Sequence, residues 1–317
     1  MKRKRLVLLS EWANQRGISY TTAYRMAKRG EIPTEQVGRF SFVVEEVEVP
    51  EGKGVALTFF THAGGAGKTS LARDLGYELA SRGYKVLLID MDPQANLTDW
   101  LGFTEVEPEE TALFLYEKGI LPEPKGVMPN LYLIPAEVSL AKAEVVLSRE
   151  PHTAFALRGA LEELRGEYDF IFVDSLPSLG TLAASAALSG DGLVVPVELS
   201  RKGVQALTVV LEAASGYANA LRKMRVWQGP SFVRLFVPNH MESAGRAREA
   251  HEVLEEIAEK WRVPIAPPLA RRPAAYREAQ ARNVPVQLTE YSEVREELKG
   301  VAEKLLEVVL PVQEVAK

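Results

Sequence analysis

Six short runs of apolar residues recur along the chain after residue 54, and patterns typical of helices lie between several of them. The runs cover residues 55–60, 86–89, 131–134, 170–173, 193–197 and 232–237. After the first run, Leu71, Leu75 and Leu79 repeat every four residues, which predicts a helix over residues 69–81 that ends at Gly83. Strands that are apolar at every position are covered on both faces. The pattern therefore predicts an α/β fold with a mostly parallel, doubly wound sheet, and two further long helices at residues 242–260 and 291–309.

The first 44 residues carry a smaller pattern of their own. Ser10 is a candidate N-cap of a helix that ends at Gly17, and Thr21 is expected to open a second helix that stops near Pro33. Residues 36–44 predict a short hairpin that turns at Gly38 and the residue after it. Helix, tight turn, helix and hairpin together predict a winged helix-turn-helix domain.

A charged segment, residues 45–53, follows this small pattern and contains Pro50 and Gly52. Such a composition predicts a linker. A chain of 317 residues suggests about two domains. We therefore predict a head at residues 1–50, which consists of the winged helix-turn-helix and the linker, and a body at residues 51–317.

The composition excludes several classes of protein. The chain has no cysteine, which rules out a disulfide scaffold, a thiolate nucleophile, a zinc–thiolate site and an iron–sulfur cluster. No apolar run is long enough for a transmembrane helix, and the run from Leu6 to Leu9 is too short for the core of a signal peptide. We therefore expect a cytoplasmic protein.

The charge is distributed unevenly. Residues 1–44 hold nine Lys or Arg and three Asp or Glu, a balance of +6, whereas the rest of the chain has a balance of −11. A small basic head on an acidic body indicates that the head meets a polyanion. The alternative is a charged surface that only contacts solvent.

A glycine-rich segment, residues 61–70 with the sequence THAGGAGKTS, joins the first predicted strand to the first predicted helix. Glycines allow backbone N–H groups to approach phosphate oxygens, and the start of the helix adds a partial positive charge. Lys68 would contact the β- and γ-phosphates of a nucleotide, and Thr69 would bind Mg²⁺. One departure from the common pattern is His62, where a glycine is usual. The expected nucleotide-binding residues of this segment are Gly64, Gly65, Ala66, Gly67, Lys68, Thr69 and Ser70.

Acidic residues follow two of the predicted strands. Asp90 and Asp92 come after residues 86–89, and Asp174 comes after residues 170–173. The carboxyl edge of an open α/β sheet is where such folds bind ligands. An isolated aspartate there is more often a turn former or a helix cap. Beside a phosphate loop, these carboxylates instead indicate partners of a nucleotide's Mg²⁺.

Three motifs, in this order and spacing, resemble those of the ParA-type partition ATPases. They are residues 64–69, residues 86–96 (VLLIDMDPQAN) and residues 168–180 (YDFIFVDSLPSLG), and the resemblance extends roughly from Val55 to Leu310. It implies a P-loop NTPase fold and an ATP-dependent homodimer that binds DNA without sequence preference. It also implies slow ATP hydrolysis that DNA and a ParB-like centromere-binding partner stimulate, and a nucleoid-associated protein that moves plasmid or chromosome cargo.

The resemblance also assigns roles to single residues. Lys68 and Asp92 match the catalytic positions, and Asp92 would orient the attacking water. Thr69, Asp90 and Asp174 match positions around Mg²⁺, and Asn239 matches a position that contacts the base.

Two positions depart from the family pattern. The family has a signature lysine that reaches across the dimer to the partner's nucleotide, and here that position is Ala63. Leu176 stands where the family usually has a proline. An arginine from elsewhere could supply the charge that Ala63 lacks.

The head resembles the MerR-like winged helix-turn-helix group, which implies binding to a specific DNA operator. Hydroxyl and guanidinium groups on the second helix can contact phosphates and base edges. The candidate DNA contacts are Thr21, Thr22, Arg25, Lys28 and Arg29 on this helix, Arg39 at the tip of the hairpin, and Arg271, Arg272, Arg277 and Arg282 as nonspecific contacts on the body. The alternative is a head that acts as an adaptor or dimerisation module.

Two other functions remain open at this point. A nucleotide-gated transcription regulator with little ATP turnover is consistent with Ala63. A membrane-cycling ATPase of the division-site type would need a basic amphipathic helix near the C-terminus. Residues 291–317 carry four basic and six acidic residues, which disfavours it.

Overall fold

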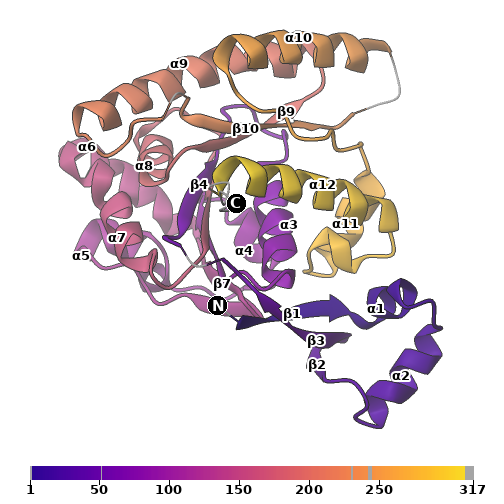
Figure 1. The fold of residues 1–317 in the computed structure, drawn as a ribbon. Helices are drawn as coiled ribbons and strands as arrows, with labels where there is room; N and C mark the ends of the chain where they lie inside the picture. Colours follow the sequence, from indigo (N-terminus) through magenta and orange to yellow (C-terminus); the bar gives the residue numbers. More distant parts are fainter. Residues whose placement is uncertain (1, 51, 230, 242–244, 311–317) are drawn as a thin grey trace, which may run out of the picture.

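A seven-stranded sheet forms the centre of the computed structural model, which describes residues 2–50, 52–229, 231–241 and 245–310 (Figure 1). The strand order is β10-β9-β4-β8-β5-β7-β6, and every neighbouring pair is parallel except β7 with β6. The strands are β4 (Val55–Phe59), β5 (Val86–Met91), β6 (Lys125–Met128), β7 (Leu131–Ile134), β8 (Phe170–Ser175), β9 (Leu193–Glu198) and β10 (Val233–Asn239). The predicted mostly parallel α/β sheet is therefore confirmed.

Helices cover both faces of this sheet. One face packs against α3 (Lys68–Ser81), α4 (Asn96–Trp100), α11 (Pro273–Ala281) and α12 (Ser292–Val309). The other face packs against α5 (Leu113–Lys118), α6 (Ala143–Arg149), α7 (Ala156–Leu164) and α8 (Thr181–Ser189). A third cluster joins α9 (Arg201–Lys223) and α10 (Gly245–Trp261) to β9 and β10. Leu88 of β5 packs in the cluster on the α3 face of the sheet. Its neighbours Leu87 and Ile89 pack in the cluster on the opposite face, as expected for strands buried on both faces.

Several element boundaries differ from the predictions. β5 and β8 each extend two residues further, so Asp90 and Asp174 lie inside strands rather than after them. The strand β6 and the helix α9 were not predicted. The predicted helix over 242–260 is observed as α10 from Gly245, and residues 242–244 lie outside the described residues. Among the described residues, no helix is long and apolar enough to cross a membrane.

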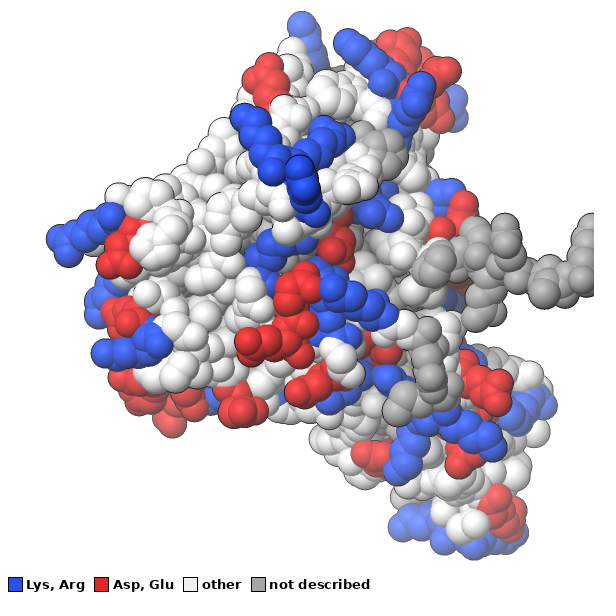
Figure 2. Space-filling model, turned by 60° about the vertical axis from the view of Figure 1, so that its left-hand side comes forward, with Lys and Arg blue, Asp and Glu red and all other residues white. Residues whose placement is uncertain are grey.

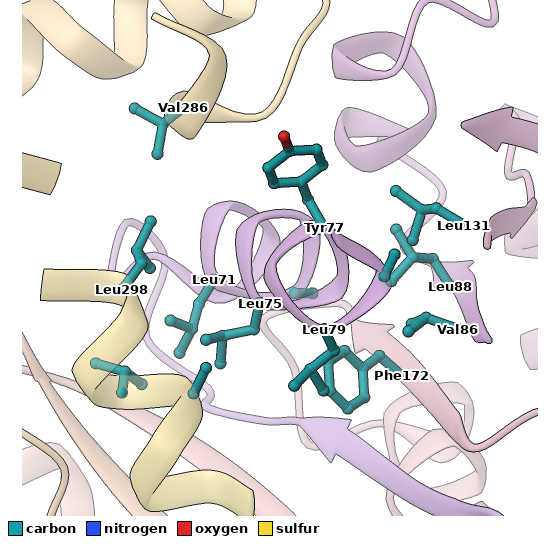
Figure 3. Packing of buried hydrophobic residues seen from close by; sticks show 14 of the residues in the cluster. Leu71, Leu75, Tyr77, Leu79, Val86, Leu88, Leu131, Phe172, Val286 and Leu298 are labelled. Carbon is teal, nitrogen blue, oxygen red and sulfur yellow. The ribbon is translucent and has the colours of Figure 1, made fainter. Parts of the chain in front are cut away.

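The helix α3 fixes the phosphate loop to the core. Figure 3 shows Leu71, Leu75 and Leu79 along this helix, with Phe172 of β8 beside Leu79. The opposite side of α3 buries the ion pair between Arg73 and Asp74, both fully inaccessible to solvent. A helix held on both sides in this way gives the loop at its N-terminus a rigid base.

The head has one more strand than predicted. It consists of β1 (Lys2–Leu8), α1 (Leu9–Gln15), α2 (Tyr20–Lys28), β2 (Thr34–Val37) and β3 (Phe40–Glu48), with the antiparallel strand order β1-β3-β2. The hairpin turns at residues 38–39, as predicted. Ser10 is not the N-cap of α1, because the helix begins at Leu9 without a side-chain cap. Ser19 caps α2 by accepting a hydrogen bond from the Thr22 N–H.

The predicted linker is wrong in its first half, because β3 continues to Glu48. This extension adds three glutamates to the head, and the charge balance of residues 2–48 is therefore +3 rather than +6. The basic character on which the polyanion prediction rests is correspondingly weaker.

The head packs directly on the body. The small sheet has two apolar faces: Val7 and Val43 pack against α1 and α2, whereas Leu6 and Phe42 belong to the main core of the body. Polar contacts support this joint, including the ion pairs Arg3–Asp169 and Lys299–Glu11 and a 3.0 Å hydrogen bond from Asn130 Nδ2 to the Lys4 carbonyl. Asp169 and Asn130 directly precede β8 and β7. The head therefore lies at the amino edge of the parallel strands, opposite the edge where their carboxyl ends lie (Figure 1).

Candidate functional site

The phosphate loop lies between β4 and α3, at the carboxyl edge of the sheet. α3 begins at Lys68, one residue earlier than predicted, and its N-cap is Gly67. Gly67 has a φ of 93°, and a Cβ atom there would lie 2.3 Å from Asn239 Nδ2. Only glycine satisfies both conditions, because other residues rarely adopt this φ and would overlap the amide.

Asn239 holds the loop from the neighbouring side. It ends β10 and is 8% exposed. Its Nδ2 donates to the Ala66 carbonyl at 2.9 Å, and its Oδ1 accepts from the His240 N–H at 2.8 Å. Both ends of the amide are thus engaged by the protein. Asn239 therefore helps to position the loop, and its predicted contact with a base stays a prediction.

Asp90 and Asp174 lie side by side on adjacent strands, since they are register partners of the β5–β8 pair. The Asp90 carboxylate accepts three hydrogen bonds, from the Asp92 N–H at 3.1 Å, the Thr98 N–H at 3.0 Å and Thr98 Oγ1 at 2.7 Å. Burial nevertheless raises the pKa of Asp90 to about 7, against the lowering effect of these donors. Asp90 fixes the turn that carries Asp92, and its predicted place near Mg²⁺ stays a prediction.

Asp174 is fully buried like Asp90, but its carboxylate is less well satisfied by hydrogen bonds from the protein. Neither of its carboxylate oxygens accepts a hydrogen bond of normal geometry from the described residues, although Thr69 and Lys68 lie close enough to act against the rise of its pKa. Burial raises the pKa of Asp174 well above its usual value, and the neighbouring Asp90 carboxylate adds to the rise. A buried carboxylate without donors is costly on its own. A cation at this position would remove that cost.

Lys68 and Asp92 complete the group. Lys68 is 6% exposed, and burial lowers its pKa, while the carboxylates of Asp174 and Asp92 act in the opposite direction. Asp92 is 7% exposed, and its Oδ1 accepts from the Gln94 N–H at 2.9 Å. Lys68 at the start of α3 and the carboxylates of Asp92 and Asp174 therefore lie together at the carboxyl edge of the sheet.

A cavity of about 400 Å³ opens at this edge. Its lining includes most of the predicted loop residues together with Asp92 and Asn239. It also includes residues that the sequence did not single out for this site: Asn96, Trp100, Pro177, His240, Pro273, Tyr276 and Gln280, with Arg271 and Arg272. Arg271 and Arg272, which were predicted to contact DNA, also line this cavity, and their DNA contact stays a prediction. Asn96 and Pro177 stand within the motifs at residues 86–96 and 168–180, whereas the other residues come from distant segments that carry no local sequence signal.

The site fits a nucleotide with Mg²⁺. Mg²⁺ typically takes one or two protein oxygen ligands and fills its shell with water and phosphate oxygens. Thr69 and the Asp174 carboxylate supply such oxygens beside the loop. Among the described residues, no three His, Asp or Glu side chains gather as a metal cage.

The predicted DNA contacts fall into two groups. On the head, the six candidates Thr21, Thr22, Arg25, Lys28, Arg29 and Arg39 are all exposed. On the body, Arg277 is exposed, but Arg272 pairs with Glu297 at 2.7 Å, and Arg282 pairs with Glu278 and lies over the ring of Phe40. Basic and acidic side chains are interspersed on the face in Figure 2. The head therefore presents the clearer candidate surface.

Comparisons with known proteins agree with this site. A family described as an AAA domain matches residues 55–223. The "Probable plasmid-partitioning protein ParA" of Thermus thermophilus is 48% identical over 314 residues, which cover 98% of this chain and 95% of that protein. The cell division protein PomZ of Myxococcus xanthus is 29% identical over 231 residues, 72% of this chain and 70% of PomZ.

A solved structure, the ATP complex of McdA from Cyanothece, matches with a TM-score of 0.70 and 26% identity over 83% of this chain and all of that chain. The chain therefore belongs to the ParA-type family of partition ATPases. Because the Thermus relative is similar over almost the whole chain, the similarity includes the head.

Proposed function

We propose that the protein is an ATP-driven homodimer that partitions DNA, with ATP hydrolysis at the carboxyl edge of the sheet. The observation that carries the proposal is that Lys68 of the phosphate loop lies beside the carboxylates of Asp174 and Asp92, with Lys68 and Asp92 lining the cavity at the carboxyl edge. The end-to-end similarity to a plasmid-partitioning ParA supports the same reading. The cargo would be a plasmid or a chromosome, and the protein would act in the cytoplasm on the nucleoid.

Each site residue has a distinct part in this proposal. Lys68 and the loop amides hold the phosphates of ATP, and Thr69 and Asp174 would hold Mg²⁺, which would neutralise charge on the phosphates. Asp92 orients the attacking water, and the Thr98–Asp90 hydrogen bonds keep its turn in place. Phosphoryl transfer depends mainly on such positioning and on electrostatic stabilisation.

We further propose that the head is a winged helix-turn-helix that binds a specific duplex. Two helices joined by a tight turn and followed by a hairpin support this, as do the exposed hydroxyl and basic side chains of α2. Tyr20 and Tyr24 on the same helix are stacked and 53% and 42% exposed, an unusual exposure for aromatic residues that contact only solvent. Arg39 at the hairpin tip is positioned as a wing contact.

The experiment for the head uses the full chain, because the joint with the body includes Leu6 and Phe42. Binding of duplex DNA from upstream of the protein's own coding region is measured for wild type, Arg25→Ala and the control Arg149→Ala, an exposed arginine of the body. Arg25→Ala should weaken binding by about 1–3 kcal/mol if the guanidinium contacts a base. If wild type binds no duplex at low salt, the head is an adaptor.

The partition proposal is tested by turnover. ATP hydrolysis should be slow alone and should rise when nonspecific DNA and a ParB-like protein are added together. The alternative, a nucleotide-gated regulator, predicts DNA binding that responds to ATP but turnover that does not respond to either addition. The membrane-cycling alternative loses support, because α12 buries Leu298, Val301 and Leu305 in the body core.

A further inference from the structure

The head and the nucleotide cavity lie at opposite ends of α3. The phosphate loop directly precedes this helix. Gly83, two residues after the helix ends, lies against the head, where a Cβ atom would be 2.9 Å from Val47 Cγ2. α3 has 14 residues, so its two ends are roughly 20 Å apart. The head therefore stands about this far from the edge at which ATP would bind.

The helix α2 lies on the outer side of the head. One face of the small sheet, with Leu6 and Phe42, packs on the body core. The other face, with Val7 and Val43, packs against α1 and α2, and Ala23 of α2 belongs to this cluster. The small sheet therefore separates α2 from the body, and Figure 1 shows α2 on the side of the head away from the central sheet. The candidate DNA contacts of α2 are exposed on this outer side.

The place of the nucleotide cavity decides where two subunits would meet. ATP can favour a dimer only if the bound nucleotide acts differently on the dimer and on the monomer. The cavity opens at the carboxyl edge beside Gly64, Gly65 and Lys68, so subunit contacts that respond to ATP lie at this edge. In a twofold dimer the axis lies in the plane between the subunits. The two heads then stand on opposite sides of this plane, with roughly 40 Å or more between them.

We infer that the ATP-bound dimer holds two separate DNA duplexes, one at each end, and so bridges two copies of the sequence that the head binds. This inference rests on the proposed ATP-driven homodimer and on the proposed DNA binding by the head. Paired helix-turn-helix domains that share one operator present their recognition helices about 34–36 Å apart, toward the same duplex. Here the two copies of α2 lie farther apart and face away from each other, so one straight duplex cannot contact both. ATP would thus convert a protein that holds one duplex into a dimer that holds two.

Bridging is measured as the capture of one duplex by another. A duplex from upstream of the protein's own coding region is fixed to beads, and a fluorescent copy is free in solution. An excess of random-sequence duplex occupies nonspecific sites. Full-length wild type with ATP and Mg²⁺ should capture the fluorescent copy. Without nucleotide it should still bind the fixed duplex, but it should capture at least about tenfold less fluorescent DNA, because the second head is absent.

Three variants show which surface and which state carry the capture. Arg25→Ala should lower capture at least about tenfold, because the contact is lost at both ends of the dimer. Arg149→Ala changes an exposed arginine of the body and is the matched control, which should capture as wild type does. Lys68→Ala should bind the fixed duplex through its head and capture no second duplex, since it loses ATP.

Sedimentation counts the duplexes on each dimer. Asp92→Ala, which should persist as an ATP-bound dimer, is mixed with an excess of the upstream duplex and should bind two duplexes per dimer. One duplex per dimer would overturn the inference. A wild-type dimer that binds the fixed duplex but captures no second one would overturn it as well. Capture that persists in Arg25→Ala would place the second duplex on the body and contradict bridging by the heads.

The same measurements separate this inference from the proposals beneath it. If wild type binds the duplex but stays monomeric with ATP, the proposed homodimer fails, and bridging fails with it. If wild type dimerises with ATP but binds no duplex, the proposed role of the head fails, and bridging again fails with it. Only a dimer that binds DNA through α2 and still holds a single duplex contradicts the bridging geometry alone.

Discussion

The two edges of the central sheet differ in how completely their polar groups are satisfied. At the amino edge, where the head packs, charged groups such as Arg3 and Lys299 have partners, and Leu6 and Phe42 of the head join the body core. At the carboxyl edge, the buried oxygens of Asp174 accept no hydrogen bond of normal geometry from the described residues, and a cavity opens beside Lys68 and Asp92. The contacts at the amino edge therefore stabilise the fold, whereas polar groups at the carboxyl edge remain available to bind a ligand.

The largest expected effect is the loss of ATP turnover after a substitution at the carboxyl edge. Asp92→Ala should lower ATP turnover by about 10²–10⁴-fold, because a carboxylate that orients the attacking water acts mainly in the transition state. Steady-state phosphate release measures it. Asp99→Ala, which changes an exposed carboxylate of the nearby helix α4, is the control and should retain turnover.

Breaking the amino edge should cost stability instead. Phe42 is 1% exposed in the joint, so Phe42→Ala should lower the free energy of unfolding by about 3–5 kcal/mol. Phe40→Ala, at a half-buried position on the same strand, should cost less. Denaturant unfolding followed by circular dichroism measures both. Two separate transitions, with only the minor one shifted by Phe42→Ala, would show that head and body fold independently.

Substitution of Thr98 should have a smaller effect on the free energy of unfolding. It is 1% exposed, donates to Asp90 and accepts from the Ala136 N–H at 2.9 Å. Thr98→Val leaves these groups unsatisfied and should cost about 1–3 kcal/mol in unfolding free energy. Turnover should also fall, because the Asp90 carboxylate that holds the turn with Asp92 loses one of its three hydrogen bonds. Full turnover in a folded Thr98→Val protein would remove Asp90 and Thr98 from the positioning of Asp92.

The smallest expected effect is a gradual change of folding stability with pH. The pKa of Asp90 is about 7 in the folded protein and near 4 when unfolded, so the folded state holds the proton more tightly. The stability from this group is therefore complete below about pH 4 and is lost as the pH rises to about 7. Asp174 acts in the same direction. Denaturation of nucleotide-free protein across this range should show the loss, and Asp90→Asn should reduce it.

The sequence predicts the carboxyl edge well because its signals are local. A glycine-rich turn between strand and helix, and aspartates at strand ends, need only a few neighbouring residues to be recognised. Non-local contacts could not be read in this way. Examples are the amide of Asn239 on the Ala66 carbonyl and the placement of Arg271 in the nucleotide cavity, both of which join distant segments.

The amino edge was predicted less well for the same reason. The sequence predicts no strand at Lys2, Lys4 and Arg5, and it predicts a linker at residues 45–48. In the fold they form paired strands, in which Lys2 lies opposite Glu48, Lys4 opposite Glu46 and Arg5 opposite Glu45. Opposite charges across two strands stabilise their pairing. Neither segment reveals this pairing alone, because the partners are about forty residues apart.

The most direct test of the central claim, that the carboxyl edge is an ATPase site with separate binding and hydrolysis residues, is the affinity for ATP and Mg²⁺ of Lys68→Ala and Asp92→Ala. Calorimetric titration of the two full-length variants measures it. Lys68→Ala should abolish binding, whereas Asp92→Ala should bind ATP nearly as wild type does and persist as an ATP-bound dimer. If Asp92→Ala loses ATP binding as completely as Lys68→Ala, Asp92 is part of the binding or metal site and its assignment to hydrolysis is wrong.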